Sequence, residues 1–150
     1  MDLNLAGKKA LITGASKGIG LAIAKRFALE GCSVVLVARS EDDLMQAQRD
    51  ILATDQRIGV EYRVANLSQT KEVSTLAKEQ ADIDILVNNA GAIPAGNINR
   101  VDEVTWREAW DLKLFGYISL CREIYASMSS RRDEPGQRVI LNIIGAGGER

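Results

Sequence analysis

Short runs of branched apolar residues alternate along the chain with longer segments of helical periodicity. The apolar runs predict five strands, over residues 8–13, 33–38, 58–65, 83–88 and 138–144. These runs are continuously apolar, which is typical of strands that are buried on both faces of a sheet. Because strands and helices alternate regularly, the pattern predicts an α/β fold built on a doubly wound parallel sheet.

Capping residues predict where the helices begin and end. Gly31 is expected to end the first helix, Ser40 to cap the second, and Ser68 to cap the third. The segment "TWRE" (105–108) has the form of a capping box and predicts the start of a longer helix. The apolar residues of that helix recur at steps of four and three, so we expect them to face the core: Trp106, Trp110, Leu114, Tyr117, Cys121, Tyr125 and Met128.

The composition is that of a globular domain. The chain has 150 residues, 46% of them apolar and 26% charged, with a formal net charge of −1, which argues against disorder and against a nucleic-acid partner. Cys32 and Cys121 are too few for a disulfide framework, and we expect both to be reduced, buried and inert. Histidine is absent, and no metal site is expected. No apolar run reaches the length of a membrane span and no leader is recognisable, so we expect a cytoplasmic protein.

A glycine-rich loop, "TGASKGIG" (13–20), connects the first predicted strand to the first helix. Gly14 suits a tight turn, Gly18 suits close approach of a pyrophosphate, and Gly20 suits close packing of the helix. Free N–H groups at the start of the helix would face the anion. Glycines also occur at strand-to-helix corners that bind nothing, so the loop alone leaves both interpretations open.

A second motif, "NNAG" (88–91), follows the fourth predicted strand. Together with the spacing TGxxxGxG it resembles the short-chain dehydrogenase/reductase family, and the resemblance covers all 150 residues. It implies a Rossmann-like NAD(P)-binding domain with strand order 3-2-1-4-5. It also implies further strands beyond residue 150, so that residues 1–150 would be an N-terminal cofactor-binding portion that is incomplete at its C-terminal end.

The resemblance also implies which residues contact a nicotinamide dinucleotide. Asn66 stands where many members have an aspartate that accepts a hydrogen bond from the adenine amine, and its amide oxygen could still accept one. The implied cofactor-binding residues are Gly14, Ser16, Lys17, Gly18, Ile19, Gly20, Arg39, Asn66, Leu67, Asn88, Ala90 and Gly91.

The end of the second strand predicts which dinucleotide is preferred. Members that prefer NAD carry an acid there, whereas this chain has Ala38 followed by Arg39. Lys17 in the glycine loop adds a second cation near the same ribose. We therefore expect NADP(H) to be preferred over NAD(H), the alternative being that both cations are ordinary solvated surface charges.

The catalytic residues of the family are only partly represented. Aligning "NIIGAGG" on the family's strand end places Gly145 at the position of the catalytic serine. Aligning "WDLKLFG" on the long helix places Lys113 at the position of the supporting asparagine. The Tyr-x-x-x-Lys motif is not in the chain, and Tyr62, Tyr117 and Tyr125 are interpreted as structural. The catalytic set is thus atypical, and we expect residues 1–150 alone to be inactive.

Two functions agree with these residues. The first is an NADP(H)-dependent oxidoreductase that transfers hydride between nicotinamide and a small carbonyl or alcohol substrate. The second is a dinucleotide-binding sensor or partner subunit that has lost catalysis; an epimerase-type relative is disfavoured by "NNAG". The uncharged segment "VILNII" (139–144) predicts a sheet edge that pairs with other chains unless it is covered, and the complete protein is expected to be a homodimer or homotetramer.

Overall fold

The structure is a computed structural model, and it describes residues 3–54, 57–91, 94, 96–97 and 99–144. Strands and helices alternate as expected from the sequence. In chain order the elements are β1 (Lys9–Thr13), α1 (Gly18–Leu29), β2 (Ser33–Ala38), α2 (Glu41–Leu52), β3 (Val60–Val64), α3 (Thr70–Glu79), β4 (Ile85–Asn88), α4 (Glu103–Trp110), a π-helix η1 (Asp111–Gly116), α5 (Tyr117–Ser130) and β5 (Val139–Asn142).

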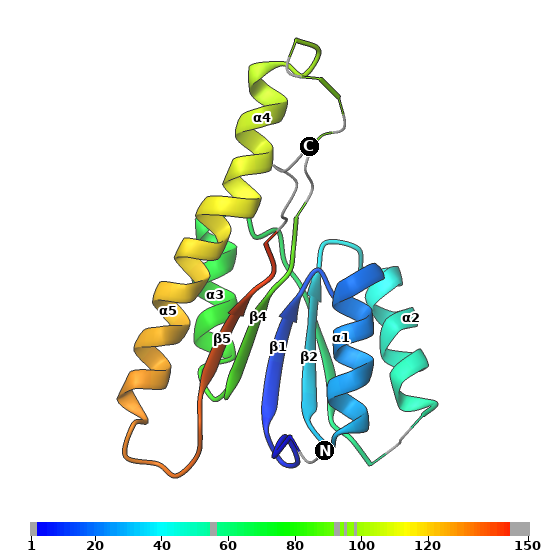
Figure 1. The fold of residues 1–150 in the computed structure, drawn as a ribbon, viewed down its shortest axis with the longest axis vertical. Coiled ribbons are helices and arrows are strands. Elements are labelled where there is room, and N and C mark those ends of the chain that lie inside the picture. Colours follow the sequence, from blue (N-terminus) through cyan, green and yellow to red (C-terminus); the bar gives the residue numbers. More distant parts are fainter. Residues whose placement is uncertain (1–2, 55–56, 92–93, 95, 98, 145–150) are drawn as a thin grey trace.

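The strands form one parallel sheet in the order β3-β2-β1-β4-β5 (Figure 1). This confirms the predicted fold class and strand order. The chain leaves β1 toward β2 on one side and later returns to place β4 on the other side of β1. In doubly wound sheets such a switch point opens a crevice at the carboxyl ends of the strands, where ligands bind.

Helices cover the sheet on both faces (Figure 1). The sheet therefore divides the core into two layers. Successive residues of a strand point to opposite faces, so Ala10 and Ile12 of β1 pack into one layer and Leu11 into the other. One layer contains buried residues of α1 and α2, namely Ala24, Ala28, Leu44, Ala47 and Ile51. The other contains buried residues of α3 and α5, namely Val73, Leu76, Ala77, Leu120, Ile124 and Met128.

The expectation that every strand is buried on both faces is right for the centre of the sheet and wrong for its edges. All four residues of β4 are buried, and so are the interior residues of β1 and β2. In contrast, Glu61 and Val64 of β3 are exposed, and in β5 only Ile140 is partly covered. An edge strand has one neighbouring strand, and the helices of this chain lie mainly over the centre of the sheet.

Two predicted helix boundaries are confirmed. Gly31 follows the end of α1 with a positive φ of 81°, and its N–H donates to the Ala28 carbonyl. Ser40 caps α2, and its Oγ accepts a hydrogen bond from the Asp43 N–H at 3.3 Å.

Two other boundaries differ from the prediction. The residue that precedes α3 is Gln69 rather than Ser68, because the Ser68 N–H and hydroxyl both bond to the Asn66 side-chain oxygen. Helix α4 is capped by Asp102, whose carboxylate accepts a hydrogen bond from the Thr105 N–H at 2.9 Å. Thr105 therefore lies inside the helix, and "TWRE" is not a capping box here.

The predicted apolar stripe of the long helix is only partly in the core. Tyr117 and Met128 are buried and Cys121 is half-buried, whereas Trp110, Leu114 and Tyr125 are exposed. Tyr125 is exposed because the buried residues of α5 recur at Tyr117, Leu120, Ile124 and Met128, and Tyr125 lies beside that row. Trp110 and Leu114 are not continuous with that row because of the π-helix between α4 and α5, which has more residues per turn than an α-helix. A stripe with α-helical spacing cannot stay on one face across such a segment.

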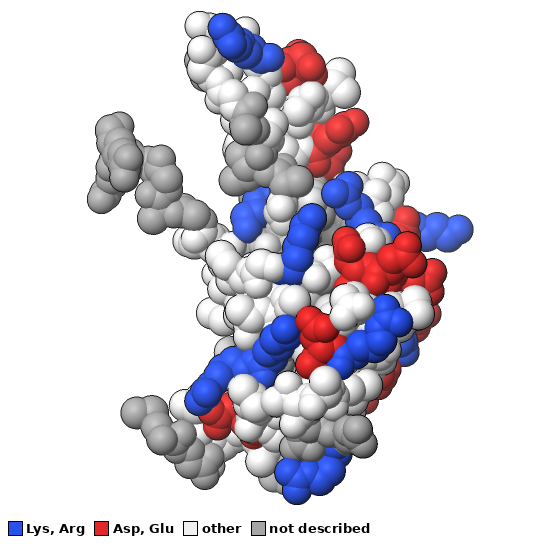
Figure 2. All heavy atoms as spheres, turned by 90° about the vertical axis from the view of Figure 1, so that its right-hand side faces the viewer, with Lys and Arg blue, Asp and Glu red and all other residues white. Residues whose placement is uncertain are grey.

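Several general expectations concern the whole chain. Cys32 is buried and Cys121 only partly buried, and neither forms a disulfide. Among the described residues there is no helix that is long and apolar enough to cross a membrane, and no cluster of three metal-ligating side chains. Basic and acidic side chains are interspersed on the face that Figure 2 shows, without a broad patch of one sign.

Candidate functional site

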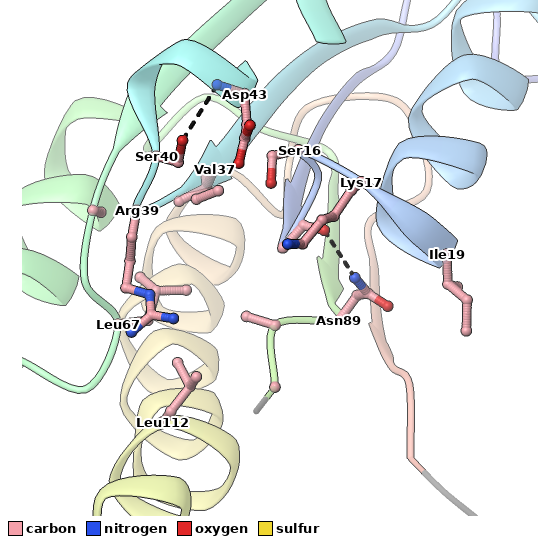
Figure 3. A pocket seen from close by; sticks show the side chains of 15 residues that line it. Ser16, Lys17, Ile19, Val37, Arg39, Ser40, Asp43, Leu67, Asn89 and Leu112 are labelled. Carbon is pink, nitrogen blue, oxygen red and sulfur yellow. Dashed lines mark hydrogen bonds between the residues drawn. The ribbon is translucent and has the colours of Figure 1, made fainter. Parts of the chain in front are cut away.

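A cavity of about 630 Å³ lies at the carboxyl ends of β1, β2 and β4 and at the start of α1 (Figure 3). Its position is the one that the switch point between β1 and β4 predicts. It is lined by Gly14, Ser16, Lys17, Ile19, Val37, Ala38, Arg39, Ser40, Asp43, Ala65, Leu67, Asn89, Ala90, Gly91 and Leu112.

Most of the residues predicted to bind a dinucleotide line this cavity. They are Gly14, Ser16, Lys17, Ile19, Arg39, Leu67, Ala90 and Gly91. Gly18 and Gly20 belong to the same loop and the first turn of α1 without lining the cavity. Asn66 lines a neighbouring cavity of about 510 Å³, which shares Arg39 and Leu112 with the first. Asn88 is fully buried and lines neither cavity.

The glycine loop has the geometry of an anion cradle. Gly14 and Gly18 adopt positive φ values of 64° and 58°, a conformation that other residues rarely take. A Cβ on Gly20 would overlap the Gly14 carbonyl oxygen and come within 2.5 Å of Asn89 Nδ2. Lys17 precedes α1 without a side-chain cap, and the first turn contains no acid. The first N–H groups of α1 are therefore not capped by a side chain, which fits a phosphate group.

The loop after β4 is attached to the end of β1 by reciprocal hydrogen bonds. Thr13 Oγ1 accepts from the N–H groups of Asn89 and Ala90 at 2.8 and 3.0 Å. The Asn89 side chain donates to the carbonyls of Thr13 and Gly14 at 3.0 and 3.3 Å. Asn89 thus holds the glycine loop and also lines the cavity, a role that the sequence analysis missed although "NNAG" contained the signal.

Asn88 connects β4 to its neighbours and does not line the cavity. Its Nδ2 donates to Asn142 Oδ1 of β5 at 2.9 Å and to Cys121 Sγ of α5 at 3.1 Å. Asn88 therefore joins β4 to β5 and α5, and its expected contact with the dinucleotide stays a prediction. The Asn66 side chain is engaged as well, because its Oδ1 accepts from the Ser68 N–H and hydroxyl at 3.2 and 2.9 Å.

Two cations and one acid surround the β2 end of the cavity (Figure 3). Arg39 extends from the end of β2, and Lys17 extends from the start of α1 into the same space. Asp43, in the first turn of α2, is the single carboxylate among the described lining residues. Ser40 contributes a hydroxyl between Arg39 and Asp43.

Lys113 lies at the other end of the site, beside the ends of β4 and β5. Its Nζ donates to Tyr117 Oη and to the Ile143 carbonyl, both at 2.7 Å, and lies 4.6 Å from the centre of the Tyr117 ring. Burial lowers the pKa of Lys113 and raises the pKa of Tyr117 to about 12. Gly145, the other residue expected in the catalytic set, lies outside the described residues.

The parallel doubly wound sheet and the glycine cradle at its switch point define a dinucleotide-binding class of protein. A family model described as short chain dehydrogenase matches residues 8–149. The chain therefore belongs to the short-chain dehydrogenase/reductase family, as the resemblance implied.

Named relatives and solved structures agree with this assignment. The chain is 36% identical over 142 residues to the 3-oxoacyl-[acyl-carrier-protein] reductase FabG of Vibrio cholerae, covering 94% of this chain and 56% of the relative. It is 33% identical over 131 residues to FabG of Escherichia coli, covering 87% and 53%. The chain thus spans about half the length of these relatives.

The fold is shared with the L-sorbose reductase of Gluconobacter frateurii, solved with NADPH and L-sorbose. The TM-score is 0.84 at 34% identity, over 95% of this chain and 54% of that one. A metagenomic short-chain oxidoreductase in complex with NADP has a TM-score of 0.85 at 30% identity, over 97% and 66% of the two chains.

Proposed function

We propose that residues 1–150 form the cofactor-binding portion of an NADP(H)-dependent oxidoreductase, which transfers hydride between nicotinamide and a small carbonyl or alcohol substrate. The observation that carries the proposal is the pair Lys17 and Arg39 at one end of the cavity, beside Ala38 where an acid would favour NAD. The glycine cradle supplies the pyrophosphate site at the start of α1.

The charges around the adenosine end favour a 2′-phosphate. Such a phosphate adds nearly two negative charges, and each cation can meet it with charge-assisted hydrogen bonds. Arg39 is exposed, so solvent screening keeps each contribution near the lower end of the usual range. A difference of about 1.4 kcal/mol already corresponds to a tenfold difference in affinity. Asp43 opposes the preference, and one carboxylate against two cations leaves a net positive site.

The similar proteins support the cofactor class. Two of the solved structures named above are complexes with NADPH or NADP, and both relatives named above are reductases. A third similar structure, a 3-oxoacyl reductase from Agrobacterium tumefaciens, also has NADP bound. No observation on this chain favours the alternative of a sensor that has lost catalysis, and turnover by the full chain would exclude it.

The test is a titration of the full chain with NADPH and with NADH at low salt. Binding is monitored by the fluorescence of the reduced nicotinamide. We expect NADPH to bind at least about tenfold more tightly, with the difference narrowing as salt screens the cations. Arg39→Ala and Lys17→Ala should weaken NADPH more than NADH. Arg49→Ala, which removes a cation of α2 that does not line the cavity, is the matched control. Equal affinities in the unmodified chain would contradict the proposal.

A further inference from the structure

Lys113 is the cation that the π-helix directs toward the ends of β4 and β5. Its Nζ is held at 2.7 Å from the Ile143 carbonyl, just after β5, and at 2.7 Å from Tyr117 Oη, one helical turn further along. A Cβ on Gly91, just after β4, would lie 3.1 Å from Lys113 Cδ and 3.4 Å from its Nζ. Gly91 lines the cofactor cavity and Lys113 lines the neighbouring apolar groove, so the ammonium lies beside a residue of the cavity wall.

This ammonium has one donor to spare. An ammonium carries three protons, and the described residues account for two of them, through Tyr117 and Ile143. On its other side Lys113 borders a mostly apolar groove lined by residues such as Trp110, Leu114 and Ile118. The third proton has no acceptor among the described residues.

The charge also has no counter-ion among the residues that the structure describes. Within the described part of the chain Lys113 forms no ion pair, whereas Lys9, Lys25, Arg107 and Arg138 do. Tyr117 cannot serve as the anion, because burial raises its pKa to about 12 and keeps it neutral near pH 7. A partly buried cation without an anion is costly, and such residues are common at functional sites. The lowered pKa of Lys113 reflects the same cost.

We propose that Lys113 supplies the positive charge and the proton at the reacting end of the cofactor cavity, and that Tyr117 and the Ile143 carbonyl position it. This proposal rests on the proposed function. It gives the chain a catalytic cation from the π-helix η1, which lies between α4 and α5. The family resemblance implies only a supporting asparagine at this helix position.

In the reduction, the substrate carbonyl carbon accepts a hydride from a bound dihydronicotinamide dinucleotide, which is oxidised by two electrons. The two π electrons of the C=O bond move to the substrate oxygen. That oxygen takes a proton from the Lys113 ammonium and becomes the hydroxyl of the product alcohol, and the neutral amine regains its proton from solvent. The ammonium acts first as the charge that stabilises the developing alkoxide and then as the general acid.

The first experiment measures the chemical reactivity of each lysine, with no need for turnover. The full chain is labelled with trace acetic anhydride over a range of pH, with and without NADP⁺, and each lysine is quantified by mass spectrometry. Because burial lowers the pKa of Lys113, we expect its labelling to begin at a lower pH than that of an ordinary lysine. Lys25, which is paired with Asp50 and does not line the cavity, is the control for labelling. NADP⁺ at about ten times its Kd should slow labelling of Lys17 and Lys113 about tenfold and leave Lys25 unchanged.

The outcomes separate the two proposals. Protection of Lys17 without protection of Lys113 would overturn the role of Lys113 and leave cofactor binding intact. Protection of neither lysine would overturn the proposed function itself.

The second experiment measures hydride transfer by the complete oxidoreductase, of which residues 1–150 are proposed to be the cofactor-binding portion. Lys113→Met should reduce kcat about 10²–10³-fold and abolish the alkaline limb of the pH profile, with the Kd for NADPH changed less than about threefold. Lys113→Arg should retain part of the rate because it keeps the charge. Tyr117→Phe, which removes a positioning contact, should shift the alkaline limb with a smaller loss of rate. A Lys113→Met variant that melts earlier but keeps the pH profile would show that Lys113 is only a structural link.

Discussion

Thr13 and Asn89 join the end of β1 to the loop after β4 in both directions. Thr13 Oγ1 accepts a hydrogen bond from the Asn89 N–H at 2.8 Å, and Asn89 Nδ2 donates to the Thr13 carbonyl at 3.0 Å. These residues belong to two motifs that are 76 positions apart. The shape of the glycine cradle therefore depends on a loop from the other half of the sheet.

Thr13→Val should loosen this connection. Valine has the same shape as threonine but leaves the N–H groups of Asn89 and Ala90 without their acceptor, which should cost about 2 kcal/mol of the free energy of unfolding. Thr13→Ser keeps the hydroxyl and should lose much less. Urea unfolding and a cofactor titration check both variants, and equal stability of the two would show that the hydroxyl contributes nothing.

The two glycines at the start of α1 should respond differently to alanine. Gly20→Ala would push a methyl group into the Gly14 carbonyl and Asn89, so we expect a large loss of stability together with loss of cofactor binding. Gly18 has no atom within 4 Å of its hypothetical Cβ, and its positive φ alone should cost about 1–2 kcal/mol. Thermal melting compares the variants. A milder effect at Gly20 than at Gly18 would contradict the packing described here.

Asp43 should limit the preference for NADP(H). Removing its charge with Asp43→Asn takes away repulsion of a 2′-phosphate, so the ratio of NADH to NADPH dissociation constants should rise about threefold to tenfold at low salt. Asp42→Asn is the control, since that acid of the same helix turn does not line the cavity. If the two variants behave alike, the effect comes from the general charge of α2.

The edge strand β5 should make the chain self-associate. Val139 and Leu141 are exposed on it, next to unpaired backbone groups of a sheet edge. Sedimentation velocity should detect dimers or larger species in the unmodified chain, and Leu141→Lys should reduce them. Leu29→Lys, at an exposed apolar position of α1, should not. A monodisperse monomer in the unmodified chain would contradict this prediction.

Cys32 should make the fold sensitive to high pH. Burial raises the pKa of its thiol from 9.0 to about 11, so the folded chain holds a proton that the unfolded chain releases. This contribution to stability is fully present below pH 9 and should fall by about 2 kcal/mol as the pH rises to about 11. Urea titrations across this range measure the slope. Cys32→Ala should flatten this slope of stability against pH. Cys121→Ala should leave the contribution of Cys32 to the slope unchanged.

The strand order was implied by the family resemblance that the two motifs carry. The sequence by itself determined the class of fold and most of the residues that line the cavity. These follow from local features: apolar runs of strand length, a glycine loop between β1 and α1, and "NNAG" after β4. Each is written in consecutive residues, because strand burial, turns with positive φ and helix starts are governed by near neighbours in the chain.

Only the tertiary structure decided which residues meet across the sheet. The π-helix moved Trp110 and Leu114 out of the core, and the edge position exposed β5, because both depend on packing rather than on local periodicity. Asp43 reached the cavity through the placement of α2. Lys113 acquired one of its two partners, the Ile143 carbonyl, from just after the end of β5, 30 positions away. A contact over that distance arises only when the parallel sheet brings the strand ends together.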